Sequence, residues 1–214
     1  MRFAFGLLAA ATLAAGPAMA AETPFYVGAG MGLGSYSINK NKLDNNLEDL
    51  TGGTVTGKAD DNANNWTIYA GWRFMENFAV EAAYLDLNGA EYRGNVTDAN
   101  GTGRVKLDWS AQGFPITALG IWPINETWEV FGRVGVFIGD VDGDGFAYID
   151  GVQNAKVSES ATSTQFIGGV GVDANFMENF AVRFEWMAMP SIGDDDVGGS
   201  ANWNQLALSL LWRF

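Results

Sequence analysis

Apolar and polar residues alternate along most of the chain after residue 20, and a period of two predicts strands. The pattern is clearest in Leu206–Phe214, where leucine, tryptophan or phenylalanine occupies every second position. Trp66–Phe74 and Phe180–Trp186 alternate in the same way. The expected strands cover residues 25–38, 65–74, 78–91, 104–122, 128–139, 161–176, 180–192 and 201–214.

An internal repeat marks the connections between these strands. Phe74–Val80, which reads Phe-Met-Glu-Asn-Phe-Ala-Val, recurs unchanged as Phe176–Val182, and Trp122–Trp128 is a looser version. Each copy predicts a short turn between two aromatic residues. The other connections are long and polar, and they alternate with the short turns: residues 39–64, 92–103, 140–160 and 193–200. All short turns then lie at one end and all long loops at the other, which is typical of bacterial outer-membrane barrels.

The predicted fold is therefore an all-β, eight-stranded, antiparallel, up-and-down transmembrane β-barrel with three short periplasmic turns and four long extracellular loops. Alternation alone also fits a soluble barrel of the lipocalin kind, which would turn its apolar face inward. The polar face favours the membrane barrel, because it carries small residues such as Gly28, Gly30, Gly32 and Gly34, which suit a crowded eight-stranded lumen. Aromatic residues at the junctions with the short turns form one girdle, as at a membrane interface: Phe74, Phe78, Trp122, Trp128, Phe176, Phe180, Trp212 and Phe214.

Charged residues on the polar face are balanced in sign. Buried charges are costly unless they are paired, so a balanced set predicts internal ion pairs that tie the strands together. Glu81 and Glu185 could also be interpreted as paired catalytic carboxylates, but their arginine neighbours favour ion pairing. The predicted network comprises Arg73, Glu81, Glu129, Arg133, Asp173, Arg183, Glu185 and Arg213.

The first twenty residues have the features of a secretory signal peptide. Met1-Arg2 is a short positive start, Phe3–Ala15 is apolar, and Ala18-Met19-Ala20 predicts cleavage after Ala20. A membrane-anchoring helix would need a longer apolar run. The expected domains are the signal peptide, residues 1–20, and the barrel, residues 21–214.

Composition narrows the range of functions. The chain has no histidine and no cysteine, which excludes a Ser-His-Asp catalytic triad and thiol chemistry. We therefore expect that the protein is not an enzyme and has no cofactor. Its net charge of −13 disfavours nucleic acid as a partner.

One acidic segment has the beginning of a calcium loop. Asp140, Asp142 and Asp144, followed by Gly145, match the first part of an EF-hand. The twelfth position is Gly151 rather than glutamate, so the bidentate ligand is missing. The segment predicts at most weak Ca²⁺ binding in the third long loop, and a solvated acidic loop is the alternative.

These segments resemble the small outer-membrane β-barrel family that includes the OmpA transmembrane domain and the Opa-type and Ail-type surface proteins. The resemblance rests on Phe25–Gly32, Ala70–Phe74, Phe78–Tyr84 and Leu208–Phe214. It implies that Leu210, Trp212 and Phe214 form a recognition signal for the barrel-assembly machinery. It also implies location in the outer membrane of a Gram-negative bacterium, with membrane lipid and lipopolysaccharide as partners. The chain ends at Phe214, so a following peptidoglycan-binding domain, and the cell-wall tethering it confers, are not expected.

Three functions remain open at this stage. The leading one is a structural barrel that contributes to envelope integrity and displays acidic surface loops. The alternatives are an adhesin or host-factor binding protein acting through the long loops, and a narrow small-solute channel. The sequence identifies no host or surface ligand.

Overall fold

The computed structural model describes residues 24–37, 40–60, 62–98, 101–149, 152–192 and 201–214. In this part of the chain there are nine strands and one helix, and no described helix is long and apolar enough to cross a membrane. The predicted signal peptide lies outside the described residues. The elements are β1 (Phe25–Ser37), α1 (Lys40–Thr51), β2 (Thr54–Asp60), β3 (Asn62–Met75), β4 (Phe78–Asp98), β5 (Gly101–Pro123), β6 (Trp128–Ile149), β7 (Val152–Asn175), β8 (Phe180–Ile192) and β9 (Ala201–Arg213).

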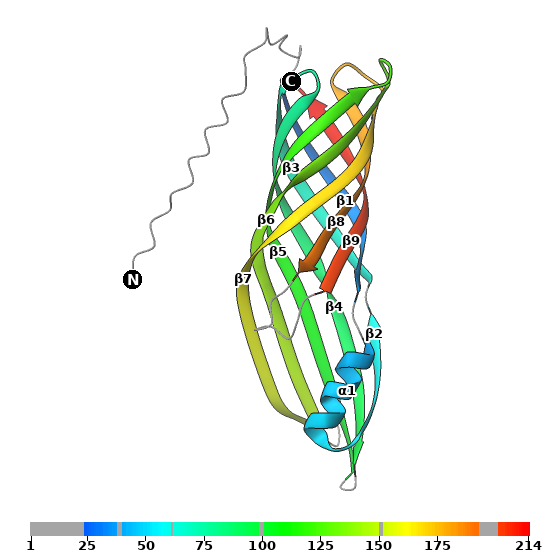
Figure 1. Ribbon diagram of the computed structural model, residues 1–214, viewed down its shortest axis with the longest axis vertical. Helices are drawn as coiled ribbons and strands as arrows, with labels where there is room; N and C mark the ends of the chain where they lie inside the picture. Colours follow the sequence, from blue (N-terminus) through cyan, green and yellow to red (C-terminus); the bar gives the residue numbers. More distant parts are fainter. Residues whose placement is uncertain (1–23, 38–39, 61, 99–100, 150–151, 193–200) are drawn as a thin grey trace, which may run out of the picture.

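Eight strands close into an antiparallel ring, which confirms the predicted fold (Figure 1). Each ring strand pairs with its neighbours in chain order, and β9 pairs back with β1, with Tyr26 opposite Arg213 and Ser37 opposite Asn202. Closure pairs the strand edges within the ring, as an apolar environment requires. The ninth strand, β2, pairs with β4 outside the ring.

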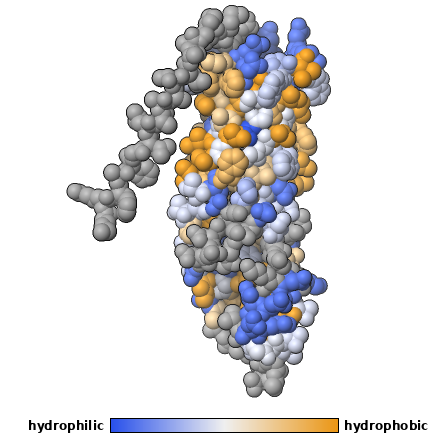
Figure 2. All heavy atoms as spheres, in the orientation of Figure 1, coloured by the Kyte–Doolittle hydropathy of each residue, from blue (hydrophilic) through white to orange (hydrophobic). Residues whose placement is uncertain are grey.

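Side chains alternate between the lumen and the outer surface, as the period of two predicts. Trp72, Phe184 and Leu210 point outward, with 49%, 49% and 59% of their surface exposed. Arg183 and Glu185 point inward and are buried. Figure 2 shows hydrophobic residues gathered over the part of the barrel nearer the short turns, and hydrophilic residues around α1 at the opposite end.

Two of the predicted long loops are wrong. Residues 92–98, 101–103, 140–149 and 152–160 continue the strands instead: β4 runs to Asp98, β5 begins at Gly101, β6 runs to Ile149 and β7 begins at Val152. Aspartate and glycine are poor strand formers, but cross-strand pairing outweighs intrinsic preference. Asp144, for example, lies between Asp108 of β5 and Ser158 of β7.

The predicted loop over residues 39–64 also contains regular structure, since α1 and β2 lie within it. We use the name raised sheet for the five-stranded sheet that extends beyond the closed ring at the end opposite the short turns. It consists of β2 with Ala90–Asp98, Gly101–Ala111, Val141–Ile149 and Val152–Ala161.

Candidate functional site in the lumen and the raised sheet

The eight predicted lumen charges form one continuous series of alternating sign, for which we use the name charge chain. At one end, Glu129 accepts from Arg73 at 2.9 Å and from Arg213 at 3.0 Å. Arg213 lies 3.9 Å from Asp173, which links this end to the centre. This part of the charge chain thus connects β3, β6, β9 and β7.

Arg183 lies at the centre of the charge chain. Its guanidinium donates two hydrogen bonds to Asp173, at 2.8 and 2.9 Å, and a third to Glu81 at 2.5 Å. Glu81 also contacts Arg133 at 3.0 Å, and Arg133 contacts Glu185 at 2.8 Å. Each buried carboxylate therefore has an arginine partner, which is the condition for holding charge away from water.

Three aromatic rings surround Arg183, and sequence reasoning missed them. Its guanidinium carbon lies 4.4 Å from the ring centre of Phe131, 5.3 Å from that of Tyr69 and 5.9 Å from that of Tyr26. The Tyr26 hydroxyl donates to Glu81 at 2.7 Å. The faces of aromatic rings attract cations, so these rings stabilise the buried charge.

A second layer of the lumen, towards the raised sheet, is apolar. The sequence predicted a lumen of small residues and ion pairs, but large apolar side chains fill this layer. We use the name apolar plug for Tyr36, Leu85, Leu87, Phe137, Ile167, Met187, Met189 and Trp203. The plug and the charge chain occupy successive levels of the same lumen.

The outer surface carries an apolar belt between two aromatic rings. The girdle predicted near the short turns is present, with the ring of Trp212 5.0 Å from Phe180 and 6.2 Å from Phe214. A second ring, which the sequence analysis missed, includes Tyr84, whose side chain contacts those of Trp66 and Phe114. On β5, Phe114–Trp122 separates the two rings, and about 9–11 residues are needed for a tilted strand to span a bilayer.

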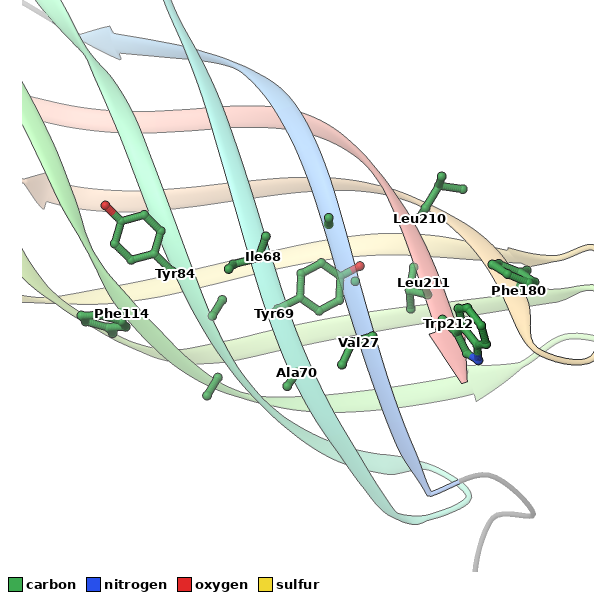
Figure 3. Close-up of a pocket in the computed structure, with 14 residues that line it drawn as sticks. Val27, Ile68, Tyr69, Ala70, Tyr84, Phe114, Phe180, Leu210, Leu211 and Trp212 are labelled. Atoms are coloured by element: carbon green, nitrogen blue, oxygen red, sulfur yellow. The ribbon is translucent and has the colours of Figure 1, made fainter. Parts of the chain in front are cut away.

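The residues of the predicted assembly signal lie on this belt. Leu210, Trp212 and Phe214 are all about half exposed and face outward. Beside them the surface has a shallow hollow of ≈ 640 Å³ around Ala70, between Val27 and Tyr84 (Figure 3). The hollow lies within the apolar belt.

The three aspartates of the predicted calcium loop do not converge. Asp140, Asp142 and Asp144 lie at alternate positions of β6, on its outer face, where Asp140 accepts from Thr162 at 2.7 Å. An EF-hand needs a curled loop that brings its oxygens to one point, and a strand spaces them apart. Among the described residues no group of three acidic side chains is placed to hold a metal ion.

Ion pairs also cross the outer face of the raised sheet. Lys106 lies 3.1 Å from Glu91 and 2.7 Å from Asp108, and Arg93 contacts Glu91. Desolvation acts to raise the pKa of Glu91, but hydrogen bonds from Lys106 and Arg93 outweigh it and lower that pKa below its usual value. A hydrogen bond from Ser158, helped by Lys156, likewise lowers the pKa of Asp144.

A closed antiparallel barrel with an apolar belt between two aromatic rings defines an outer-membrane β-barrel protein. The family profile of the OmpA-like transmembrane domain matches residues 20–214. The chain belongs to that family, which confirms the resemblance inferred from its sequence.

Solved structures have the same fold. The chain is similar to Ail, the attachment invasion locus protein of Yersinia pestis, with 18% identity, a TM-score of 0.53, and coverage of 91% of this chain and 100% of that one. It is also similar to Neisserial surface protein A, with 14% identity, a TM-score of 0.50, and coverage of 89% and 97%. Identities this low show the fold alone. No curated protein sequence matches the chain.

Proposed function

We propose that the protein is a non-enzymatic outer-membrane barrel that is closed to solutes, strengthens the envelope, and binds an extracellular macromolecule through its raised sheet. One observation carries the proposal: the lumen is filled, whereas an ordered sheet extends beyond the membrane belt. A filled lumen disfavours transport, and a purely structural barrel needs no sheet outside the bilayer.

The filled lumen disfavours the channel alternative. Conduction needs a continuous wet path, but the apolar plug and the charge chain fill successive levels of the lumen. We expect only small or transient currents in planar bilayers. Large, steady single-channel currents would contradict a closed barrel.

Removal of the β4, β5, β6 and β7 parts of the raised sheet separates the structural role from the binding role. Two hairpins are shortened by joining Leu87 to Ala111 and Gly139 to Ser163 through Asn-Gly turns, because each pair is already directly opposed. The ring should still fold, as judged by the heat-dependent gel mobility of outer-membrane barrels. Bacteria that display the shortened chain should bind host cells or matrix less than bacteria that display the full chain. Equal binding would leave only the structural role.

The proposal includes secretion and assembly into the outer membrane. Cleavage after Ala20 would release the barrel domain, and Leu210, Trp212 and Phe214, which face outward beside the last strand pair, would be presented to the barrel-assembly machinery. Membrane lipid and lipopolysaccharide are then the surroundings of the belt. Cell fractionation and N-terminal sequencing test this: we expect an outer-membrane protein that begins at Ala21, and a soluble periplasmic protein would contradict it.

A further inference from the structure

The seven-residue repeat occupies the same place in the fold in both of its copies. Phe74–Val80 spans the short turn from β3 to β4, and Phe176–Val182 spans the short turn from β7 to β8. In each copy, an asparagine is the last residue before the strand that leaves the turn: Asn77 before β4 and Asn179 before β8. The contacts of this asparagine show what the repeat does beyond making a turn.

The asparagine of each copy binds the neighbouring strand through both its backbone and its side chain. The backbone carbonyl of Asn179 accepts from the backbone N–H of Arg213 at 2.8 Å, and its side-chain amide donates to the Arg213 carbonyl at 2.8 Å. Asn77 makes the same two bonds to Ile121, at 2.8 and 2.9 Å. The side-chain amide thus acts as a further backbone group and extends the pairing of the two strands by one residue.

The looser third copy of the repeat has only the backbone bond. Thr127 is the last residue before β6, and its carbonyl accepts from the backbone N–H of Asn175 at 2.7 Å. The asparagine of this turn is Asn125, and its side chain accepts from the backbone N–H groups of Thr127 and Trp128, both at 2.9 Å. Among these three turns, the side-chain bond to the next strand therefore belongs to the two identical copies.

The two asparagines hold strands with different positions in the ring. Ile121 lies within β5, which has β4 and β6, its neighbours in the chain, on its two sides. Arg213 is the last residue of β9, whose two partners are β8 and the first strand, β1. The last ladder pair between β8 and β9 joins Phe180 to Trp212. A strand end beyond its last pair frays unless another bond holds it, and the bonds from Asn179 hold Arg213.

The aromatic rings beside the two asparagines also differ. Phe180, which follows Asn179, lies opposite Trp212 with 5.0 Å between the ring centres (Figure 3). The ring of Trp212 lies 6.2 Å from that of Phe214. Phe78, which occupies the same position in the first copy, lies opposite Gly120, which has no side chain. The second copy thus adds its own ring to two rings of the predicted assembly signal.

We propose that Asn179 is a positioning residue for the assembly signal. Until the ring closes, β9 has β8 as its one partner, and the two bonds from Asn179 hold Arg213 on that partner. Trp212 and Phe214, on either side of Arg213, then face outward together beside Phe180. The assembly machinery meets a preformed hairpin of β8 and β9, and preorganisation removes part of the entropic cost of binding. This inference rests on the proposed function, because it concerns the assembly signal named there.

The two copies of the repeat provide a matched pair of variants. Asn179→Ala and Asn77→Ala each remove one side-chain hydrogen bond, of nearly equal length, from the same local sequence. Each variant, without the predicted signal peptide, is unfolded in urea and diluted into lipid vesicles with or without the reconstituted barrel-assembly machinery. Heat-dependent gel mobility follows the folding. We expect equal rates without the machinery, and with it a rate for Asn179→Ala about fivefold below that of Asn77→Ala, the factor that one net hydrogen bond supplies.

Two results would overturn the proposal. Equal rates of the two variants in the presence of the machinery would give Asn179 no role beyond that of Asn77. A deficit of Asn179→Ala that is as large without the machinery as with it would mean that the bond acts on folding itself and not on recognition.

A second substitution tests the hydrogen bond and not the size of the side chain. Asn179→Asp keeps the shape of the side chain, but an ionised carboxylate only accepts hydrogen bonds and cannot donate to the Arg213 carbonyl. We expect this variant to fold as slowly as Asn179→Ala when the machinery is present. Folding at the rate of the unaltered protein would reject the role of this bond.

Phe214→Ala distinguishes failure of this inference from failure of the proposed function. We expect both Phe214→Ala and Asn179→Ala to lose acceleration by the machinery. If only Phe214→Ala loses it, the assembly signal stands and the positioning role of Asn179 alone falls. If Phe214→Ala keeps it, the assembly signal is wrong, and this inference falls with it.

Discussion

The ring of Tyr26 lies over Gly71, its directly opposed residue on β3, where a Cβ atom would come within 2.1 Å of the ring. The same arrangement holds for Tyr69 over Gly28 and for Phe131 over Gly171. These are the three rings that surround Arg183. Glycines of the lumen therefore leave room for the aromatic side chains that stabilise the central arginine.

Substitution at Gly71 should displace Tyr26 and loosen its bond to Glu81. We expect Gly71→Val to reduce the free energy of unfolding by about 1–3 kcal/mol, the usual cost of overpacking. Urea unfolding in lipid vesicles, followed by tryptophan fluorescence, measures this. Gly132→Val is the matched control, because the nearest atom to its added Cβ would be 4.0 Å away, and it should change stability little. Equal stability of the two variants would contradict the steric argument.

The charge chain predicts that replacing its arginines destabilises the barrel by different amounts along its length. Arg183 neutralises both Asp173 and Glu81, whereas Arg73 at the end of the chain contacts only Glu129 among the eight. Because an unpaired buried charge costs about 3–5 kcal/mol, Arg183→Met should destabilise the barrel by that amount or prevent folding. Arg73→Met should cost less, since Glu129 keeps Arg213 and is closer to water. The same urea-unfolding measurement compares the two variants. If Arg183→Met does not fold, its refolding yield should still be lower than that of Arg73→Met.

Much of the barrel was predictable, because the face on which a strand residue lies depends only on whether its position along the strand is odd or even. Arg133 and Glu129 share a face simply by being four residues apart, and the balance of charge then indicates that this face is the buried one. The same parity places Phe131 and Phe137 beside Arg133, so a signal for the aromatic rings and the plug was present. It was missed because apolar residues on a membrane strand were all interpreted as facing lipid, whereas the lumen also needs large side chains.

The raised sheet was less predictable, because no local pattern identifies it. Asp140–Gly145 alternates aspartate with small residues, a composition typical of loops, and only pairing with Ser158 and its neighbours makes it a strand. The helix α1 depends similarly on a distant contact, the bond between Asp44 and Tyr92.

The strand geometry of Asp140, Asp142 and Asp144 predicts that calcium is not bound specifically. Titration with millimolar CaCl₂ should give no saturable heat in calorimetry, and EDTA should not change the unfolding midpoint. The triple variant with asparagine at these three positions should behave identically in both measurements. Saturable heat that disappears in the triple variant would mean that the three carboxylates converge in solution.

The pKa of Glu91 provides a test of the ion pairs on the raised sheet. Hydrogen bonds from Lys106 and Arg93 hold this pKa below its usual value of 4.5, although desolvation acts in the opposite direction. A carboxyl whose pKa is lower in the folded state stabilises the fold above its unfolded pKa, and this contribution is lost as pH falls through the lowered value. The pairing should therefore be complete above about pH 5 and lost in acid. Carbon-13 NMR of the Glu91 carboxyl in nanodiscs should give a titration midpoint below pH 4.5. The Lys106→Met variant should raise this midpoint. The control variant Lys156→Met, which removes a lysine that pairs with Asp144 instead, should leave it unchanged. A midpoint that does not move in Lys106→Met would show that the pair is not formed in solution.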